Sequence, residues 1–172
     1  MRIILPAAGL ALAGITLLGA CSKQEKGPTQ REQIGQSWKY ESKQPEGGGA
    51  PIKLAYIGSA NTVATMTAPD TFSVVLLQKL RSGETGVTVK LVGAPFSCDL
   101  SDCQVSASVD GKPAEQWKGR IADTKDGIEI PPARKAADEI IGSKTLKVDL
   151  VTGPKEAKTS FTFDTAGLDW KG

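Results

Sequence analysis

The sequence predicts a mainly β protein: a single antiparallel, sandwich-like domain of about eight strands with one short helix near residues 132–141. Apolar and polar residues alternate repeatedly between residues 36 and 164, and a period of two is typical of strands with one buried face. Turn-forming dipeptides such as Asp-Gly and Gly-Pro separate these runs. A length of about 130 residues suffices for one domain, which we place at residues 37–172.

The first two strands are expected at residues 38–40 and 54–56, where aromatic and aliphatic side chains alternate with polar ones. The run QPEGGGAP between them is rich in glycine and proline and indicates a loop. We expect the second of these strands to pair with the segment that contains Val63 and Thr65 and with the edge of the next strand.

A hairpin is expected next, from TFSVVLLQKL and GVTVKLV with RSGET as the turn. Phe72, Val74 and Leu76 should share one face of its first strand. The run VVLL is apolar on both faces, so this strand should be central and covered on two sides.

Alternation is clean from Cys103 to Val109, and Asp-Gly then marks a turn. A turn of only two residues would place Trp117 on the polar face of the next strand. Since burial of the indole ring should decide the register, we predict a loop of three or five residues that also absorbs Pro113.

The helix is predicted from proline at 132, a favourable first helical position, to a stop at Gly142. Its apolar residues recur at i, i+3, i+4, i+7 and i+8. They are Ala133, Ala136, Ala137, Ile140 and Ile141. Two more strands should follow, at 146–150 and 161–163, joined by a turn at Gly-Pro 153–154.

Residues 1–20 have the composition of an export signal peptide, with one basic residue, Arg2, before an apolar run. The run is shorter than the ~20 apolar residues that cross a bilayer, and no basic cluster follows it directly. Residues 22–36 are mostly polar and charged, which is typical of a hydrated tether.

The stretch Leu18-Gly19-Ala20-Cys21 resembles the lipobox of bacterial lipoproteins. The resemblance implies cleavage before Cys21, attachment of diacylglycerol and a fatty acyl chain such as palmitate there, and a lipidated tether at residues 21–36. Several acyl chains anchor a protein stably where one is marginal. Ser22 stands where inner-membrane retention signals place aspartate, so the resemblance implies the outer membrane. The alternative is an ordinary exported protein with a buried Cys21.

Two of the three cysteines, Cys98 and Cys103, lie in the segment CDLSDC. In an oxidising envelope this spacing predicts a disulfide, and closing so small a loop contributes about 2 kcal/mol. A redox-active pair is the alternative, although the spacing is not C-x-x-C. The sequence offers no further soft ligands for a zinc site.

Composition excludes several kinds of chemistry. The chain has no histidine, which removes Ser-His-Asp and Cys-His catalysis and His-ligated metals. It has 21 basic and 19 acidic residues, a balance too even for nucleic-acid binding. We expect no catalytic residues, no metal and no cofactor.

Three groups of residues deserve consideration as sites. Asp164 and Asp169 could form a carboxylate pair beside Trp170, as in a glycosidase, although packing of the chain end explains them as well. The other two groups are serines near lysines, which could support Ser-Lys chemistry, and cations that could contact an anionic glycan or lipid. These are Ser106, Ser108 and Ser160, and Lys112, Lys118 and Arg120. Solvent-facing strand residues, with lysines that protect an edge, are the simpler interpretation of both.

The second half of the chain resembles a group of bacterial envelope proteins. The shared features are a cysteine-flanked strand, a turn at Asp-Gly, a helix and the closing segment FTFDTAGLDW. The closing segment is also distantly similar to that of the VasI-type accessory proteins of type VI secretion. The resemblance covers roughly residues 36–170, departs from the pattern at Thr165, and brings no catalytic residues.

Together these observations predict a lipid-anchored envelope protein, facing the periplasm from the outer membrane, that is not an enzyme. It would bind another protein of unknown identity or stabilise an envelope assembly. The alternative is an immunity or inhibitor protein that blocks a periplasm-acting toxin or a cell-wall hydrolase. A hydrolase with paired carboxylates is a third possibility.

Overall fold

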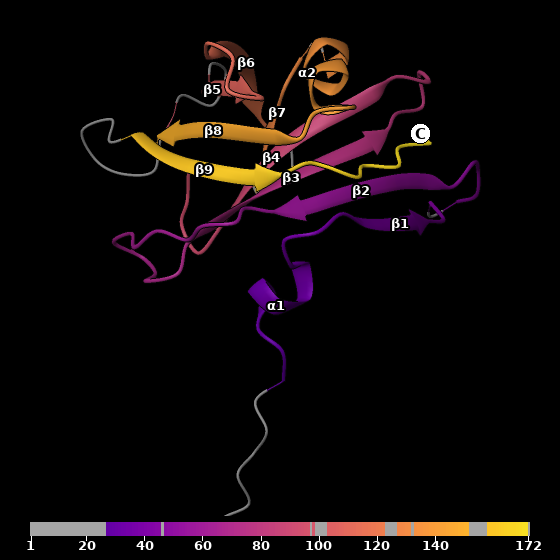
Figure 1. Ribbon diagram of the computed structural model, residues 1–172. Coiled ribbons are helices and arrows are strands. Elements are labelled where there is room, and N and C mark those ends of the chain that lie inside the picture. Colours follow the sequence, from indigo (N-terminus) through magenta and orange to yellow (C-terminus); the bar gives the residue numbers. More distant parts are fainter. Residues whose placement is uncertain are drawn as a thin grey trace, which may run out of the picture.

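The structure, a computed structural model, describes residues 27–45, 47–96, 98, 103–122, 127–131, 133–151 and 158–171. Within these residues it contains nine strands and two short helices (Figure 1). The strands are β1 (Lys39–Lys43), β2 (Ile52–Gly58), β3 (Phe72–Lys79), β4 (Thr85–Val92), β5 (Cys103–Val109), β6 (Glu115–Ile121), β7 (Ile128–Glu129), β8 (Thr145–Val151) and β9 (Lys158–Asp164). The helices are α1 (Gln30–Ile34) and α2 (Ala133–Ile140). None of the described helices is long and apolar enough to span a bilayer.

All nine strands form one antiparallel sheet in the order β1-β2-β3-β4-β7-β6-β5-β8-β9. The prediction of a mainly β, single-domain protein is confirmed, and so is the helix predicted at 132–141. The sheet is continuous, whereas a sandwich has two separate sheets. The reason is β7, which pairs with both β4 and β6 although it is only two residues long.

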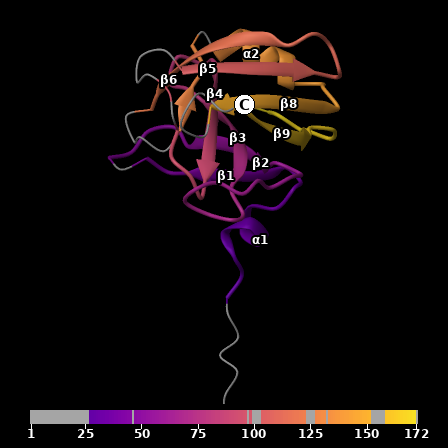
Figure 2. The ribbon, with the colours of Figure 1, turned by 90° about the vertical axis from the view of Figure 1, so that its left-hand side faces the viewer.

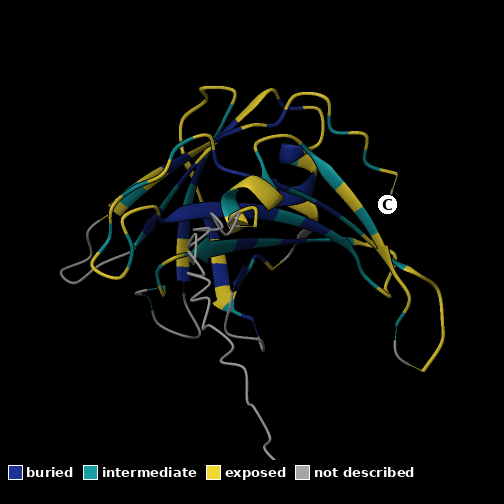
Figure 3. Cartoon of the chain, turned by 90° about the horizontal axis from the view of Figure 1, so that it is seen from below, coloured by how far each residue is buried: buried dark blue, intermediate teal, exposed yellow. Residues whose placement is uncertain are grey.

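The sheet bends so that its two halves enclose a common core. Figure 2 shows β8 above β1, β2 and β3, although all of these strands belong to the same open sheet. Buried side chains from both halves form one cluster, with Val75, Leu77 and Val89 on one side and Val148 and Phe161 on the other. Burial of each such side chain contributes about 1.5–3 kcal/mol. Figure 3 shows the buried residues along the middle of the strands and exposed ones in the loops.

The β3–β4 hairpin has the predicted pairing, from Phe72 opposite Val92 to Lys79 opposite Thr85. The expectation that β3 is covered on two sides holds only in part. Val74 is buried on the outer face of the sheet, but Leu76 next to it on that face is partly exposed. Among the described residues, the outer face of β3 is covered only near its first residue, Phe72, where α1 lies over the strand. There the Arg31 guanidinium lies 5.0 Å from the centre of the Phe72 ring.

The strand β2 pairs with β3, the next strand, as expected, but not with residues 63–65, which corrects that part of the expectation. It lies between β1 and β3, and Val63 instead forms an isolated bridge with Thr71. The chain between β2 and β3 lacks the regular apolar alternation of a strand. It folds back on itself, and Val63 pairs with Thr71.

The β5–β6 hairpin confirms the predicted register, because Trp117 lies opposite Val105 and is buried. The turn itself is tight: the Lys112 amide donates to the carbonyl of Val109 at 3.0 Å, with positive φ angles at 110 and 111. One extra residue at Pro113 then shifts β6 by one position and brings the indole ring to the core side.

The segment predicted as a hydrated tether is partly helical in the portion that the structure describes. Its described portion contains α1, which begins with a capping box between Thr29 and Glu32. The helix rests on the end of β2, where the carbonyl of Gly35 accepts a hydrogen bond from the Gly58 amide at 3.1 Å. A Cβ at position 58 would lie 2.5 Å from that carbonyl oxygen, so the close approach requires glycine.

The disulfide between Cys98 and Cys103 is present, with the two Cα atoms 5.2 Å apart. It joins Cys98 to the first residue of β5, Cys103, which is fully buried. The predicted lipid attachment at Cys21 and the Gly-Pro turn at 153–154 lie outside the described residues.

Candidate functional site

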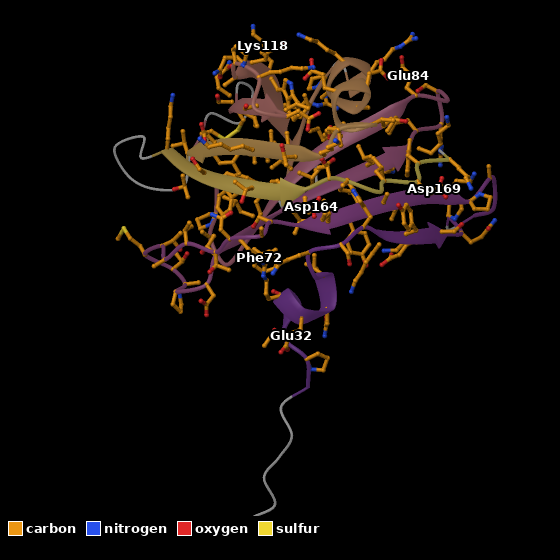
Figure 4. The ribbon with its side chains drawn as sticks, viewed as in Figure 1. Glu32, Phe72, Glu84, Lys118, Asp164 and Asp169 are labelled. Atoms are coloured by element: carbon orange, nitrogen blue, oxygen red, sulfur yellow. A yellow bond between two sulfur atoms is a disulfide. The ribbon has the colours of Figure 1, made fainter. Side chains whose placement is uncertain are left out.

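The acidic pair considered for a glycosidase is used structurally. The Asp164 carboxylate accepts the amide of Ala166 at 3.2 Å and so closes a turn, and Asp169 pairs with Lys171 at 3.1 Å. The indole of Trp170 donates to the Thr85 hydroxyl at 2.9 Å, which fastens the chain end to β4. Figure 4 shows Asp164 and Asp169 on separate parts of the chain end rather than facing each other across a cleft.

The three serines lie on regular strands. Ser108 donates to the carbonyl of Lys112 at 2.6 Å, and Ser160 donates to the carboxylate of Asp149 at 2.5 Å. Asp149 is also 3.6 Å from the ammonium group of Lys147. The hydroxyls of Ser108 on β5 and Ser160 on β9 act as hydrogen-bond donors within the sheet, which agrees with the simpler interpretation.

The three cations do not form one patch. Lys112 lies in the β5–β6 turn, whereas Lys118 lies in the middle of β6 and Arg120 is the last residue but one of that strand. Figure 4 shows Lys118 on β6. Strands rise about 3.3 Å per residue, so Lys118 lies roughly 10 Å beyond Glu115, the first residue of β6 after the turn. Arg120 is paired through two nitrogen atoms with Glu129 on β7, at 2.9 and 3.1 Å.

A broad hollow on the described surface lies beside α2, and we call it the α2 groove. It measures about 760 Å³ and is shallow and open to solvent. Three parts of the chain form it: α2 and the residues that follow, the β5–β6 turn, and the β3–β4 turn. Its lining residues are Glu84, Val109, Asp110, Lys112, Arg134, Lys135, Asp138, Glu139, Ile141, Gly142 and Ser143.

A network of charges fixes α2 beside β6 at one end of this groove. The ammonium group of Lys135 contacts the carboxylate of Glu115 and lies 3.6 Å from that of Glu139. The hydrogen bond and charge of Glu115, followed by the charge of Glu139, raise the pKa of Lys135. Glu139 also accepts the indole N–H of the buried Trp117 at 3.0 Å, so the network connects the helix to the core.

The other end of the groove is fixed by Asp110. One of its carboxylate oxygens accepts the amides of Lys144 and Thr145 at 2.8 and 2.9 Å. These bonds from Thr145 and Lys144 lower the pKa of Asp110. The same residue donates its own amide to the carbonyl of Thr145 at 2.9 Å, so the β5–β6 turn is tied to the start of β8.

Ile141 is the apolar element of the groove. The sequence pattern placed it on the buried stripe of the helix, but α2 ends at Ile140 and the side chain of Ile141 is 39% exposed. The buried part of the stripe is Ala136, Ala137 and Ile140, which pack against the core beside β4. The helix stops one residue early because Gly142 adopts a positive φ of 84°.

The groove therefore presents an exposed aliphatic side chain surrounded by both acidic and basic groups. An open surface of this kind suits contact with another protein better than enclosure of a small molecule. Among the described residues, no cluster of three or more potential ligands could hold a metal ion. Sequence reasoning missed the groove because its three parts are far apart in the chain.

Comparison with known proteins finds no matching family model, no matching curated protein and no matching solved structure.

Proposed function

We propose that this protein is a lipid-anchored, non-enzymatic module that binds another protein in the bacterial envelope. The export segment and the lipobox-like stretch at residues 18–21 support the anchor at Cys21, and Ser22 supports the outer membrane facing the periplasm. The observation that carries the binding function is the exposed Ile141 in the open, mixed-charge α2 groove.

The attachment of α1 limits how far the body could move from the membrane. Thr29, which begins the capping box, lies eight positions after Cys21, and extended chain spans at most about 3.5 Å per position. If Cys21 is lipidated, α1 would lie within about 28 Å of the acyl chains. A partner would therefore be met close to the membrane surface.

The anchor is tested by mass spectrometry of the amino-terminal peptide, with fractionation of cells that express the full chain. We expect an acylated Cys21 and recovery with outer membranes. The Cys21→Ala variant should appear in the soluble periplasmic fraction. An unmodified residue 21 in the wild-type protein would contradict the anchor.

The groove is tested by photo-crosslinking in living cells, with a photoreactive amino acid at position 141. Position 66 is the matched control, because Met66 is 88% exposed on the β2–β3 loop. We expect a discrete crosslinked protein from position 141 and none from position 66. The same products from both positions, or none from either, would contradict a binding role for the groove. If the crosslinked protein is a toxin or a cell-wall hydrolase, the inhibitor role is the correct form of the proposal.

A further inference from the structure

The direction of the main-chain groups in β1 follows from the bonds at the end of β2. The amide of Ser59 donates to the carbonyl of Ser73, on the β3 side, at 2.8 Å. The amide of Gly58 donates to Gly35 on the opposite side. Main-chain groups alternate in direction along a strand, so the even-numbered residues of β2 bond to β1.

In β1, the residues opposite those even-numbered positions are Lys39, Glu41 and Lys43. Their main-chain groups therefore face β2. The groups of Tyr40 and Ser42 face away from the sheet, and β1 is the first strand in the sheet order. No described residue bonds to these outward groups, and Figure 1 shows no element beyond β1.

A hollow lies beside this edge. It measures about 330 Å³ and is lined by residues 40–42 of β1, residues 53 and 54 of β2 and the chain end at residues 169–171. Tyr40 is 49% exposed there, and its hydroxyl accepts the amide of Asp169 at 2.8 Å. Lys53 donates to the carbonyl of Lys171 at 2.9 Å, so the chain end forms a fixed wall.

We propose that β1 binds an extended segment of a partner protein as an additional strand of the sheet. The outward N–H and C=O groups of Tyr40 and Ser42 would supply the main-chain bonds, and the hollow would receive a side chain of the added strand. Main-chain bonds combined with a pocket for alternate side chains are the general basis of strand addition.

The side chains of β1 define the chemistry of that segment. On the outer face of the sheet, Lys39, Glu41 and Lys43 favour acidic, basic and acidic residues opposite them. On the inner face, an apolar residue suits the position opposite Tyr40. In antiparallel orientation the complementary sequence is Glu-Thr-Lys-Val-Glu.

A second copy of this chain fits the edge less well. If two copies of β1 paired over their whole length, Glu41 would lie opposite its own counterpart. Lys39 of each copy would lie opposite Lys43 of the other copy. Like charges directly opposite each other are destabilising, so the charge pattern favours a different protein as the partner.

The test uses hydrogen exchange of the full chain, read at single residues by mass spectrometry. The probe is a nine-residue peptide with Glu-Thr-Lys-Val-Glu at its centre, and the control peptide has Lys-Thr-Glu-Val-Lys in the same frame. We expect the matching peptide at millimolar concentration to slow exchange of the Tyr40 and Ser42 amides at least tenfold. The control peptide should leave both amides within about twofold of the free protein.

Ser42→Pro removes one outward donor and no bond to β2, so it should fold and lose the protection at Tyr40. The inference would be overturned if Tyr40 and Ser42 were already as protected as Glu41 without peptide, since the edge would then be covered. It would also be overturned if neither peptide, or both equally, slowed exchange, or if protection rose with protein concentration alone, which would indicate self-association.

This inference rests on the protein-binding part of the proposed function only. An unmodified Cys21, or a failure of crosslinking at position 141, would refute the anchor or the groove without changing the exchange at Tyr40 and Ser42. Conversely, an edge that does not bind the peptide would leave both of those results intact.

Discussion

The two edge strands of this sheet, β1 and β9, differ in whether other residues bond to their outward main-chain groups. The edge of β9 is covered by the two residues that follow Ser59. The Ala60 amide donates to the carbonyl of Thr162 at 2.6 Å, and the Asn61 side chain donates to the carbonyl of Ser160 and accepts the Thr162 amide, both at 2.9 Å. No described residue covers β1 in this way.

The difference illustrates two solutions to the same physical problem. An exposed edge offers unpaired main-chain groups to other strands, and proteins cover such edges, shorten them or place charges on them. In β9 one amide side chain acts as a short piece of additional strand. In β1 the strand is five residues long and carries Lys39, Glu41 and Lys43, whose charges favour a partner strand of matching charge.

The largest effect is expected from Glu41→Pro. It removes an N–H that bonds to β2 and leaves a carbonyl there without its donor, so we expect the free energy of unfolding to fall by about 3 kcal/mol. Chemical denaturation followed by tryptophan fluorescence measures it. Ser42→Pro is the matched control and should cost less than about 1 kcal/mol, because proline is tolerated where the N–H faces away from a sheet. Equal losses would mean that the main-chain groups of β1 point the other way.

A smaller loss is expected from Asn61→Ala, which uncovers β9. Two main-chain groups lose their partner and gain only water, so the free energy of unfolding should fall by about 2 kcal/mol. Hydrogen exchange of the Thr162 amide should become faster while that of Tyr40 is unchanged. Asn61→Asp keeps the acceptor and should lose about half as much. An unchanged Thr162 amide would show that the β9 edge is not protected by this side chain.

Trp38→Phe tests a link between the two edges. The indole of Trp38, just before β1, donates to the carbonyl of Thr165, just after β9, at 3.0 Å. Phenylalanine retains most of the buried ring but cannot donate, so we expect a loss of about 1 kcal/mol. The melting temperature gives the measurement, and a value equal to that of the wild type would mean that water replaces the bond.

The smallest effect is a pH dependence of the contact between β1 and β2. The Tyr56 hydroxyl donates to Glu41 at 2.8 Å, and this bond, followed by that from Lys43, lowers the pKa of Glu41. A depressed carboxyl pKa contributes stability above the unfolded value of about 4.3, and this contribution is lost as the pH falls through the folded pKa.

The Glu41 hydrogen bond also raises the pKa of Tyr56, so its contribution is present below the unfolded value of about 10 and is lost as the pH rises through the folded pKa. Tyr56→Phe should therefore destabilise the protein most between about pH 5 and 9. Thermal melts of both proteins across this range measure the difference. A difference that does not vary with pH would exclude a role for the charged form of Glu41.

Some features of the candidate sites depend on residues that are close in the sequence, and others depend on residues that are far apart in it. The sequence indicated the Cys98–Cys103 pair, since the two cysteines are only five positions apart in the chain. It also indicated the burial of Trp117, which needed only the length of one loop. The sequence pattern wrongly placed Ile141 on the buried face of α2. The apolar pattern continues to Ile141, whereas the helix already ends at Ile140, next to the cap that Gly142 provides. The α2 groove was invisible, because Glu84, Asp110 and Ile141 meet only when three separate turns converge.

The sequence by itself determined where most of the strands lie, where α2 ends to within a residue, and the buried face of strands with clean alternation such as β5. It did so because a period of two or of 3.6 residues records the direction of each side chain. Only the tertiary structure decided that β7 joins the halves into one sheet, that Asn61 covers β9 and that β1 stays open. Those choices depend on which strands become neighbours. A side-chain period carries no information about which strands become neighbours. The lengths of the connecting loops add little, because the entropy of closing a loop changes only slowly with its length.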